Sequence, residues 1–291
     1  MKKKNISAIL ITALFTACLS GCSDNSQSTS QDSQTSSITG SQTDSTGSSQ
    51  ETSSSKEETS AGASSATPEI KEITESPVED FEYEYDEKLD GMVIKKYVGT
   101  DSVVGVPSVI EGQNVVSIGK QAFIRYDSLT DVTIPDSVII IDNNAFCDCI
   151  RLTGITIPDG VTTIGDCSFY GCISLESIAF PDSVTYIGRN AFYKCSGLKS
   201  VTIPGSVERI GYEAFAICTR LASVTIEDGV SIIGNNAFTK CECLTSVTIP
   251  DSITSIGKYT FEKCKNLANV TYKGKTYSYS NIDELYAEIN G

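Results

Sequence analysis

Apolar and polar positions repeat every 23 residues through most of the chain. Counting Val132 as position 1, Val or Ile stands at positions 1, 3, 7 and 10 of almost every unit, and Ala-Phe, Cys and Leu stand at 14–15, 18 and 21. Six units follow one another over 132–269 without an insertion. A fixed period of this length predicts a repeat solenoid, in which neighbouring units stack and share one hydrophobic core.

Each unit predicts one short strand followed by turns. The inward residues at positions 1 and 3 flank a Thr at position 2, which should face solvent. Pro at position 4 lacks an amide hydrogen, so it should end the strand and start a turn. Gly at position 11 predicts a backbone bend, and Ala-Phe at positions 14 and 15 predicts a short helical turn that places the ring in the core.

Residues 80–131 are predicted to form an N-terminal cap and a first, atypical coil. Aromatic and acidic residues alternate over 81–85, as in a half-buried strand, and 91–99 and 103–107 are further strand candidates. The repeat register begins at 115–119. A terminal coil is expected to depart from the repeat, because one of its faces has no neighbour.

Residues 270–291 are predicted to close the other end of the solenoid. The last strand is expected at 270–272, with 276–279 pairing back onto it. Asn281, with Glu284 three residues later, is typical of a helix start. One face of that helix would carry apolar side chains and cover the open core, namely Ile282, Leu285, Tyr286 and Ile289.

The repeat unit L-x-x-V-x-I-P-x-x-V-x-x-I-G-x-x-A-F-x-x-C, found over about 115–269, resembles the BspA-like, or Treponema pallidum-type, leucine-rich repeat. The resemblance implies a curved parallel solenoid with one strand per coil. It also implies an exported protein of the bacterial surface. Relatives of this kind are associated with adhesion to host matrix proteins and other cells, and with coaggregation.

The N-terminus predicts export. Three lysines at 2–4 precede an apolar stretch over 6–17, which is too short to span a membrane. The following Leu19-Ser20-Gly21-Cys22 resembles the bacterial lipobox, which implies that 1–21 is a lipoprotein signal peptide and that Cys22 carries a membrane-anchoring lipid. The alternative is ordinary signal cleavage, with Cys22 a plain thiol. The lipid would hold the protein on the outer face of the cell membrane.

Residues 22–79 are expected to form a disordered stalk behind the lipidated Cys22. They are rich in Ser, Thr and acidic residues and have almost no large apolar side chains before Ile70. Such a composition cannot bury enough surface to offset the entropy lost on ordering. The stalk would separate the repeats from the membrane.

Composition excludes several functions. The chain has 22 Lys and Arg against 37 Asp and Glu, a net charge of -15, which argues against a nucleic-acid partner. It has no His, so neither a catalytic triad nor a His-ligated metal site is possible. We therefore predict no enzyme activity, no cofactor and no metal site.

Six of the 11 cysteines occupy position 18 of successive units. A ladder of buried thiols is the interpretation we favour, because Cys packs as a small apolar residue. Disulfides remain an alternative in an exported protein, most plausibly through Cys147, Cys167 or Cys243. A metal site at the C-x-C pairs is a third.

Three kinds of surface residue are candidates for binding. Position 2 forms a row of exposed Thr that includes Thr156 and Thr202, although Thr is also simply well suited to strands. Asp at position 5 could bind Ca²⁺ or merely fix turns. Tyr170, Tyr193, Tyr186 and Tyr212 form our preferred contact surface, because exposed tyrosines are common at protein interfaces.

Together these patterns predict a non-catalytic, lipid-anchored surface protein. Its leucine-rich-repeat solenoid would mediate protein–protein or cell adhesion by binding an extracellular protein, glycan or cell-surface ligand. The alternative is a structural spacer or assembly scaffold at the bacterial surface, with no soluble ligand.

Overall fold

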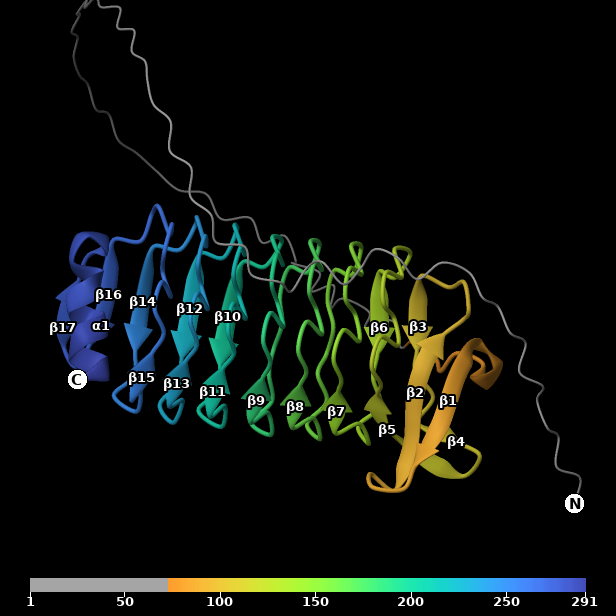
Figure 1. Ribbon diagram of the computed structural model, residues 1–291. Helices are drawn as coiled ribbons and strands as arrows, with labels where there is room; N and C mark the ends of the chain where they lie inside the picture. The colour runs from red at the N-terminus through yellow and green to blue at the C-terminus, as the bar shows by residue number, and fades with distance from the viewer. Residues whose placement is uncertain (1–72) are drawn as a thin grey trace, which may run out of the picture. The chain divides into compact units, whose positions relative to one another are not determined.

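The computed structural model describes residues 73–291, which form a parallel solenoid of about eight turns with a period of about 23 residues (Figure 1). The fold class predicted from the repeat is therefore confirmed. The signal sequence, Cys22 and residues 22–72 of the predicted stalk lie outside the described residues. Within 73–291, none of the helices has the length and apolar character needed to cross a membrane.

A continuous sheet runs along one side of the coils. Its strands pair in parallel from β2 onward, and each position 10 stands beside position 10 of the next coil, as Ile141 does with Ile164. In order, the strands are β1 (Phe81–Asp86), β2 (Gly91–Tyr97), β5 (Gln113–Ile118), β7 (Ile140–Ile141), β8 (Thr163–Ile164), β9 (Tyr186–Ile187), β11 (Arg209–Ile210), β13 (Ile232–Ile233) and β15 (Ser255–Ile256), with β4 (Val109–Ile110) paired to β5.

The strands predicted at positions 1 to 3 form a second, interrupted layer. Thr at position 2 is exposed and its neighbours are buried, as in Ser200–Ile203. A two-stranded sheet pairs β3 (Val103–Gly105) with β6 (Asp131–Thr133), and a five-stranded sheet contains β10 (Ser200–Ile203), β12 (Ser223–Ile226), β14 (Ser246–Ile249), β16 (Asn269–Tyr272) and β17 (Lys275–Tyr277). Most coils thus have two short strands rather than the single strand we expected.

The core is a stack of identical side chains. The seven phenylalanines at position 15, from Phe123 to Phe261, are each at most 2 % exposed. Successive rings lie 5.0–6.0 Å apart between centroids and are nearly parallel, with interplanar angles of 5–13°. This spacing is favourable for stacked aromatic rings. The prediction that position 15 fills the core is confirmed.

Glycine at position 11 has a different role from the predicted backbone bend. None of these glycines has a positive φ. A Cβ on Gly188 would lie 2.6 Å from the carbonyl carbon of Gly165, and one on Gly211 would lie 2.4 Å from the Gly188 oxygen. Glycine is required because neighbouring coils approach here backbone to backbone.

The turn around positions 14 and 15, where we expected a helical turn, is non-helical, because left-handed residues on either side interrupt it. Positions 13 and 17 have φ between 52° and 72° in every coil, from Gln121 and Arg125 to Tyr259 and Lys263. Amides at positions 13, 15 and 17 consequently point to the next coil, as Phe146 N–H does to the Ser168 oxygen at 2.7 Å. The amides at positions 14, 16 and 18 donate to carbonyl oxygens of the same turn, as Cys147 N–H does to the Asn144 oxygen.

The N-terminal cap contains the strands expected from the sequence. β1 and β2 form an antiparallel hairpin, and β2 pairs with β5 at the start of the repeats. Ordered chain begins before the predicted residue 80, since the helical turn η1 (Val78–Asp80) precedes β1. Ser76 N–H donates to the Gly105 oxygen at 2.7 Å, and Glu75 accepts from Ser108 N–H at 2.8 Å, so this segment is held against the first coil.

The C-terminal cap replaces the missing next coil. The helix α1 (Ile282–Asn290) follows β17 and η2 (Tyr279–Asn281), and it buries Leu285 and Ile289 as predicted. The capping box is Ser278 with Asn281, rather than Asn281 with Glu284. The difference arises because a turn of 3-10 helix precedes α1 and takes the capping interactions.

Three side chains of this cap imitate the backbone of a further coil. The Asn290 amide accepts from Ile256 N–H at 3.0 Å and donates to the Ile256 oxygen at 2.9 Å, at the edge strand β15. The hydroxyls of Tyr286 and Tyr279 accept from the amides of Phe261 and Lys263, at 3.2 and 3.1 Å. Edge groups that a neighbouring coil would satisfy are thereby satisfied by the cap.

Candidate binding surfaces

Tyr170 and Tyr193 form a stacked pair. They occupy position 16 of adjacent coils, and their ring centroids are 5.0 Å apart at an interplanar angle of 5°. Both are half-buried, and burial raises the pKa of each phenol above its usual range. Backbone bonds on either side hold the turns together, because Asp148 and Gly171 donate to the oxygens of Tyr170 and Tyr193. The structure brings these two predicted residues together on a rigid base.

The other two predicted tyrosines lie elsewhere on the coil. Tyr186 begins β9 and is 38 % exposed, and its hydroxyl is 3.4 Å from an Asp166 carboxylate oxygen. Tyr212 is 37 % exposed, and the Arg189 guanidinium lies over its ring, 5.0 Å from the centroid. Among the described residues, no ring contact joins either tyrosine to the stacked pair. One face of Tyr212 is already occupied by Arg189, which leaves less of that ring for a ligand.

Three exposed isoleucines, which the sequence reasoning missed, extend the tyrosine pair. Ile124, Ile150 and Ile173 are 37–40 % exposed and stand at positions 16 and 19 of consecutive coils. We call the apolar ridge the apolar side chains at these two positions in the first four coils, namely Ile124, Cys147, Ile150, Tyr170, Ile173 and Tyr193; the remaining two are polar, Asp127 and Ser196. Adjacent exposed apolar side chains are typical of interaction sites. The sequence contains a sign of this surface, because Ile recurs at repeat positions that face solvent.

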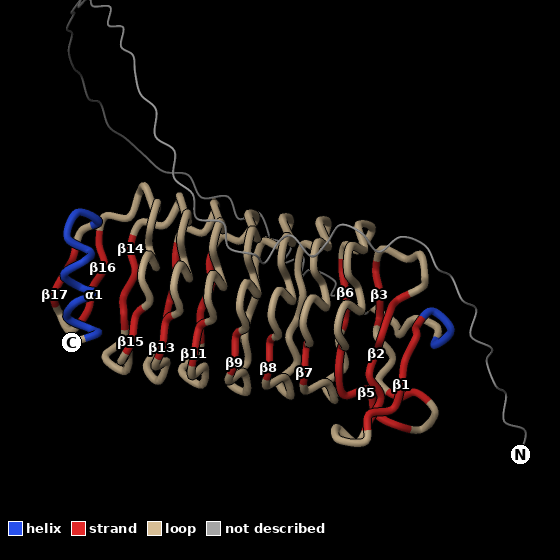
Figure 2. The backbone as a smooth tube through the Cα atoms, viewed as in Figure 1, coloured by secondary structure: helices blue, strands red, loops and turns tan. Residues whose placement is uncertain are grey.

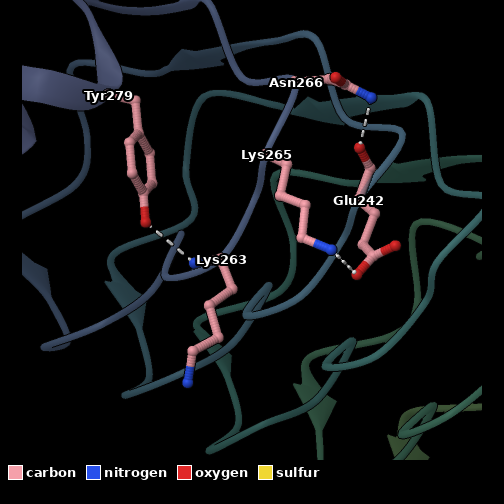
Figure 3. A network of polar contacts seen from close by, with 5 residues as sticks. All are labelled: Glu242, Lys263, Lys265, Asn266 and Tyr279. Carbon is pink, nitrogen blue, oxygen red and sulfur yellow. Dashed lines mark hydrogen bonds and ion pairs between the residues drawn. The ribbon is translucent and has the colours of Figure 1, made fainter. Parts of the chain in front are cut away.

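Toward the C-terminus position 19 is charged, at Glu242 and Lys265 (Figure 3), and position 16 is polar, at Thr239 and Glu262. There the Lys265 ammonium lies 2.8 Å from the Glu242 carboxylate, and the Asn266 amide donates to the Glu242 oxygen at 2.9 Å. Lys263 N–H donates to the Tyr279 hydroxyl. Because charged and polar side chains occupy positions 16 and 19 here, the apolar ridge does not continue into these coils.

A groove of about 650 Å³ opens on the strand layer between β6 and β10. Thr156, predicted as a binding residue, lies in it. Thr202 is exposed in β10, outside the groove. The lining residues are Asp131, Gly154, Ile155, Thr156, Ile157, Asp159, Ser177, Ile178, Ala179, Phe180 and Pro181.

The groove lies where the strand layer is interrupted. In the described chain, the segments 154–157 and 177–180 form no strand of this layer, and only an isolated bridge joins Thr156 to Ala179. Figure 2 draws this stretch as loop. Small residues replace larger ones here: Ala179 stands where other units have Thr, and Gly154 where most have Ser or Asp. Phe180 replaces Ile at position 3, and its ring packs edge-on against Phe192 at 5.5 Å.

The position-18 cysteines form the thiol ladder that we favoured from the sequence. Each thiol donates to the carbonyl of the position-15 phenylalanine in the preceding coil, as Cys195 does to Phe169 at 3.1 Å. Burial raises the pKa of Cys149 and of Cys218 to about 12. No disulfide joins the cysteines within 73–291, Cys147, Cys167 and Cys243 among them.

The structure assigns no metal site to the Asp column at position 5. Within 73–291, no group of three or more Cys, Asp or Glu side chains is placed to hold a metal ion. The neighbouring Ser at position 6 joins the coils instead, which we did not foresee. Ser137 and Ser183 each donate to a carbonyl of the preceding coil, at 2.7 Å.

Comparison with family models places these coils in a known group. Six copies of the BspA-type leucine-rich repeat match the chain over 116–242 and 187–284. The chain belongs to the BspA-type leucine-rich repeat family. Comparison with curated proteins gave no match.

Solved structures support this membership. A T. pallidum leucine-rich repeat protein is 35% identical, with a TM-score of 0.63, and the match covers 67% of this chain and 91% of that one. A leucine-rich cell surface protein from Faecalibacterium prausnitzii is 32% identical, with a TM-score of 0.60, and the match covers 68% of this chain and 56% of that one. A leucine-rich repeat protein from Bacteroides ovatus is 33% identical, with a TM-score of 0.59, and the match covers 66% of this chain and 52% of that one. The chain spans about half the length of the last two.

Membership in the BspA-type family indicates the general kind of function, without naming a ligand. Leucine-rich-repeat folds are typically non-enzymatic, and relatives of this chain include a protein described as a cell surface protein. A general protein-binding role agrees with both.

Proposed function

We propose that this protein is a lipid-anchored component of the bacterial surface whose solenoid binds an extracellular protein, glycan or cell-surface ligand without catalysing a reaction. The observation that carries the proposal is the apolar ridge. It combines a rigid, stacked pair of tyrosines with exposed isoleucines on one part of the surface. A rigid aromatic pair gives contact area at little entropic cost, which suits a hot spot for protein binding.

Adhesion is the form of binding that we propose, because the family includes cell-surface proteins and the ridge is open to large partners. The test is saturation binding of the whole chain to immobilised matrix proteins, mucins, glycans and intact bacterial cells. We expect saturable binding to at least one class. If folded protein binds none of them, the adhesion proposal fails and the spacer or scaffold function takes its place.

Anchoring through Cys22 is a separate part of the proposal. Two acyl chains on one cysteine would hold the protein on a membrane stably, whereas one chain would not. Cells expressing the chain should incorporate labelled fatty acid into it, and Cys22→Ser should abolish the label and release the protein from the membrane fraction. Label that persists in Cys22→Ser would contradict lipidation at this residue.

A further inference from the structure

We propose that the groove between β6 and β10 binds a basic side chain, lysine or arginine, presented by an exposed segment of a partner protein. The inference deepens the proposed function, since it rests on the solenoid being a binding module and names the ligand chemistry of one surface. The volume of about 650 Å³ lies within the range of ordinary ligand pockets. Three features of the groove point to a cation with an apolar stem.

The charge of the groove is entirely negative. Asp131 and Asp159 line it, and none of its lining residues is basic. Both side chains are exposed, and neither carboxylate has a hydrogen-bond or ion-pair partner among residues 73–291. Some carboxylates elsewhere on the solenoid, such as Glu176 and Glu242, are paired with lysines, and others are unpaired; the two in the groove differ in facing one concave surface. Two unpaired carboxylates on one concave surface favour a positively charged group from outside the chain.

The base of the groove is apolar. Ile155 and Ile178 retain 8 % and 7 % exposure, and the half-buried Phe180 lies beside them. Lysine and arginine carry long methylene stems that pack on apolar surface while the charged end stays near carboxylates. An inorganic cation would gain nothing from such a base, whereas a basic side chain would use both parts of the groove.

The groove also has room that the repeat normally fills. An added Cβ on Gly154 would meet nothing within 4 Å, so a larger side chain at this residue would extend into open space. Gly154 has no positive φ, so substitution is compatible with its backbone. Gly154→Phe should therefore block the groove while leaving the coil folded.

The chain has no tryptophan, so Phe180→Trp gives a single fluorescent reporter in the groove. The whole chain carrying this substitution is titrated with an acetylated hexapeptide alternating lysine and alanine, and separately with its glutamate counterpart. We expect a saturable fluorescence change with the lysine peptide only. Calorimetric titration of the unsubstituted chain checks that Phe180→Trp does not itself create the site.

Matched variants separate the groove from the general acidity of the chain. Asp131→Asn with Asp159→Asn should weaken lysine-peptide binding by about tenfold, since two charged contacts are lost. Asp228→Asn with Asp251→Asn removes the same charge outside the groove and should leave binding within about twofold of the parent. Gly154→Phe should abolish binding, whereas Ser223→Phe, at the same repeat position in β12, should not.

Equal binding of the lysine and glutamate peptides, no binding of either, or equal weakening by the two pairs of Asp→Asn substitutions would each overturn the inference. Failure here is distinguishable from failure of the proposed function. Adhesion is measured with macromolecular ligands and depends on the apolar ridge, which none of these variants alters.

Discussion

At the scale of single residues, the repeat forms the same weak contact in coil after coil. One thiol donating to a carbonyl is a weak hydrogen bond, but six coils repeat it between positions 18 and 15. The thiol is small enough for the core and gives the carbonyl a second hydrogen bond, since Phe169 O already accepts from Cys172 N–H. Ala or Val at position 18 would lack this additional bond between coils.

The buried thiols should make the fold sensitive to alkali. Burial raises the pKa of Cys218 from 9.0 to about 12. Above pH 9 the unfolded chain therefore loses this proton while the folded chain keeps it, so stability falls as pH rises. Between pH 7.5 and pH 10 we expect a loss of about 1 kcal/mol in the free energy of unfolding per such thiol.

Urea unfolding under reducing conditions at the two pH values measures this effect. Cys218→Ala should be less stable than the parent at pH 7.5, but it should lose about 1 kcal/mol less between the two pH values. Cys243 is exposed, so Cys243→Ala should be as stable as the parent at both pH values. Parallel pH profiles for the parent and Cys218→Ala would refute the account of the ladder.

The left-handed turn residues predict an unusual preference for glycine. Tyr259 has a φ of 60° and is 60 % exposed, so its side chain contributes little to the core. A residue with a Cβ is strained in this conformation by about 1–2 kcal/mol, and glycine is not. Tyr259→Gly should therefore be more stable than Tyr259→Ala by about 1 kcal/mol in urea unfolding.

The neighbouring Lys258 supplies the control, because it is exposed and its φ is not positive. At this residue the order should reverse, with Lys258→Ala at least as stable as Lys258→Gly. The turn assignment is wrong if alanine is also the better residue at position 259.

At the scale of elements, the ends of the solenoid decide whether it stays a single stack. Strand β15 would present an unpaired edge to solvent, but Asn290 on α1 bonds to both the amide and the carbonyl of Ile256. Tyr286 and Tyr279 perform the same role for the turn amides. The cap therefore closes the core and also removes a template for unwanted strand pairing.

Loss of the Asn290 amide should expose this edge. Asn290→Ala leaves two Ile256 backbone groups without their partners, which we expect to cost about 1–3 kcal/mol. Hydrogen exchange at the Ile256 amide should accelerate, while exchange in β9 and β11 stays slow. Glu284→Gln, an exposed change on the same helix, should alter neither. Unchanged exchange in Asn290→Ala would show that the cap does not depend on this residue.

The sequence predicts the elements that have a strong periodic pattern. Phe192, Cys195 and Leu198 could be placed in the core from their 23-residue spacing, and the strand at positions 1 to 3 from its alternation. The strand ending at position 10 could not be predicted, because two residues carry no alternation. The turn geometry was also hidden, since residues as different as Asn144, Lys194 and Ile217 adopt the left-handed conformation.

At the scale of the whole molecule, the two ends of a regular stack have different surfaces. The core positions barely change along the solenoid, whereas position 16 changes from Ile124 to Glu262, and position 19 changes from Ile150 and Ile173 to Glu242 and Lys265. The tyrosine pair could be proposed from the sequence, but its stacking required the coil geometry. The groove could not be predicted, because departures from the repeat such as Ala179 and Phe180 do not by themselves show that two coils lose their strand pairing.

The central claim is that the N-terminal half of this solenoid is a binding surface. It is tested most directly by saturation binding of the whole chain to the matrix proteins, mucins, glycans and cells named above, with Tyr170→Ser and Tyr193→Ser combined in one variant. Tyr259→Ser with Tyr279→Ser is the matched control in the C-terminal half. We predict at least tenfold weaker binding for the first pair and unchanged binding for the control. Equal affinity of both variants and the parent would contradict the claim.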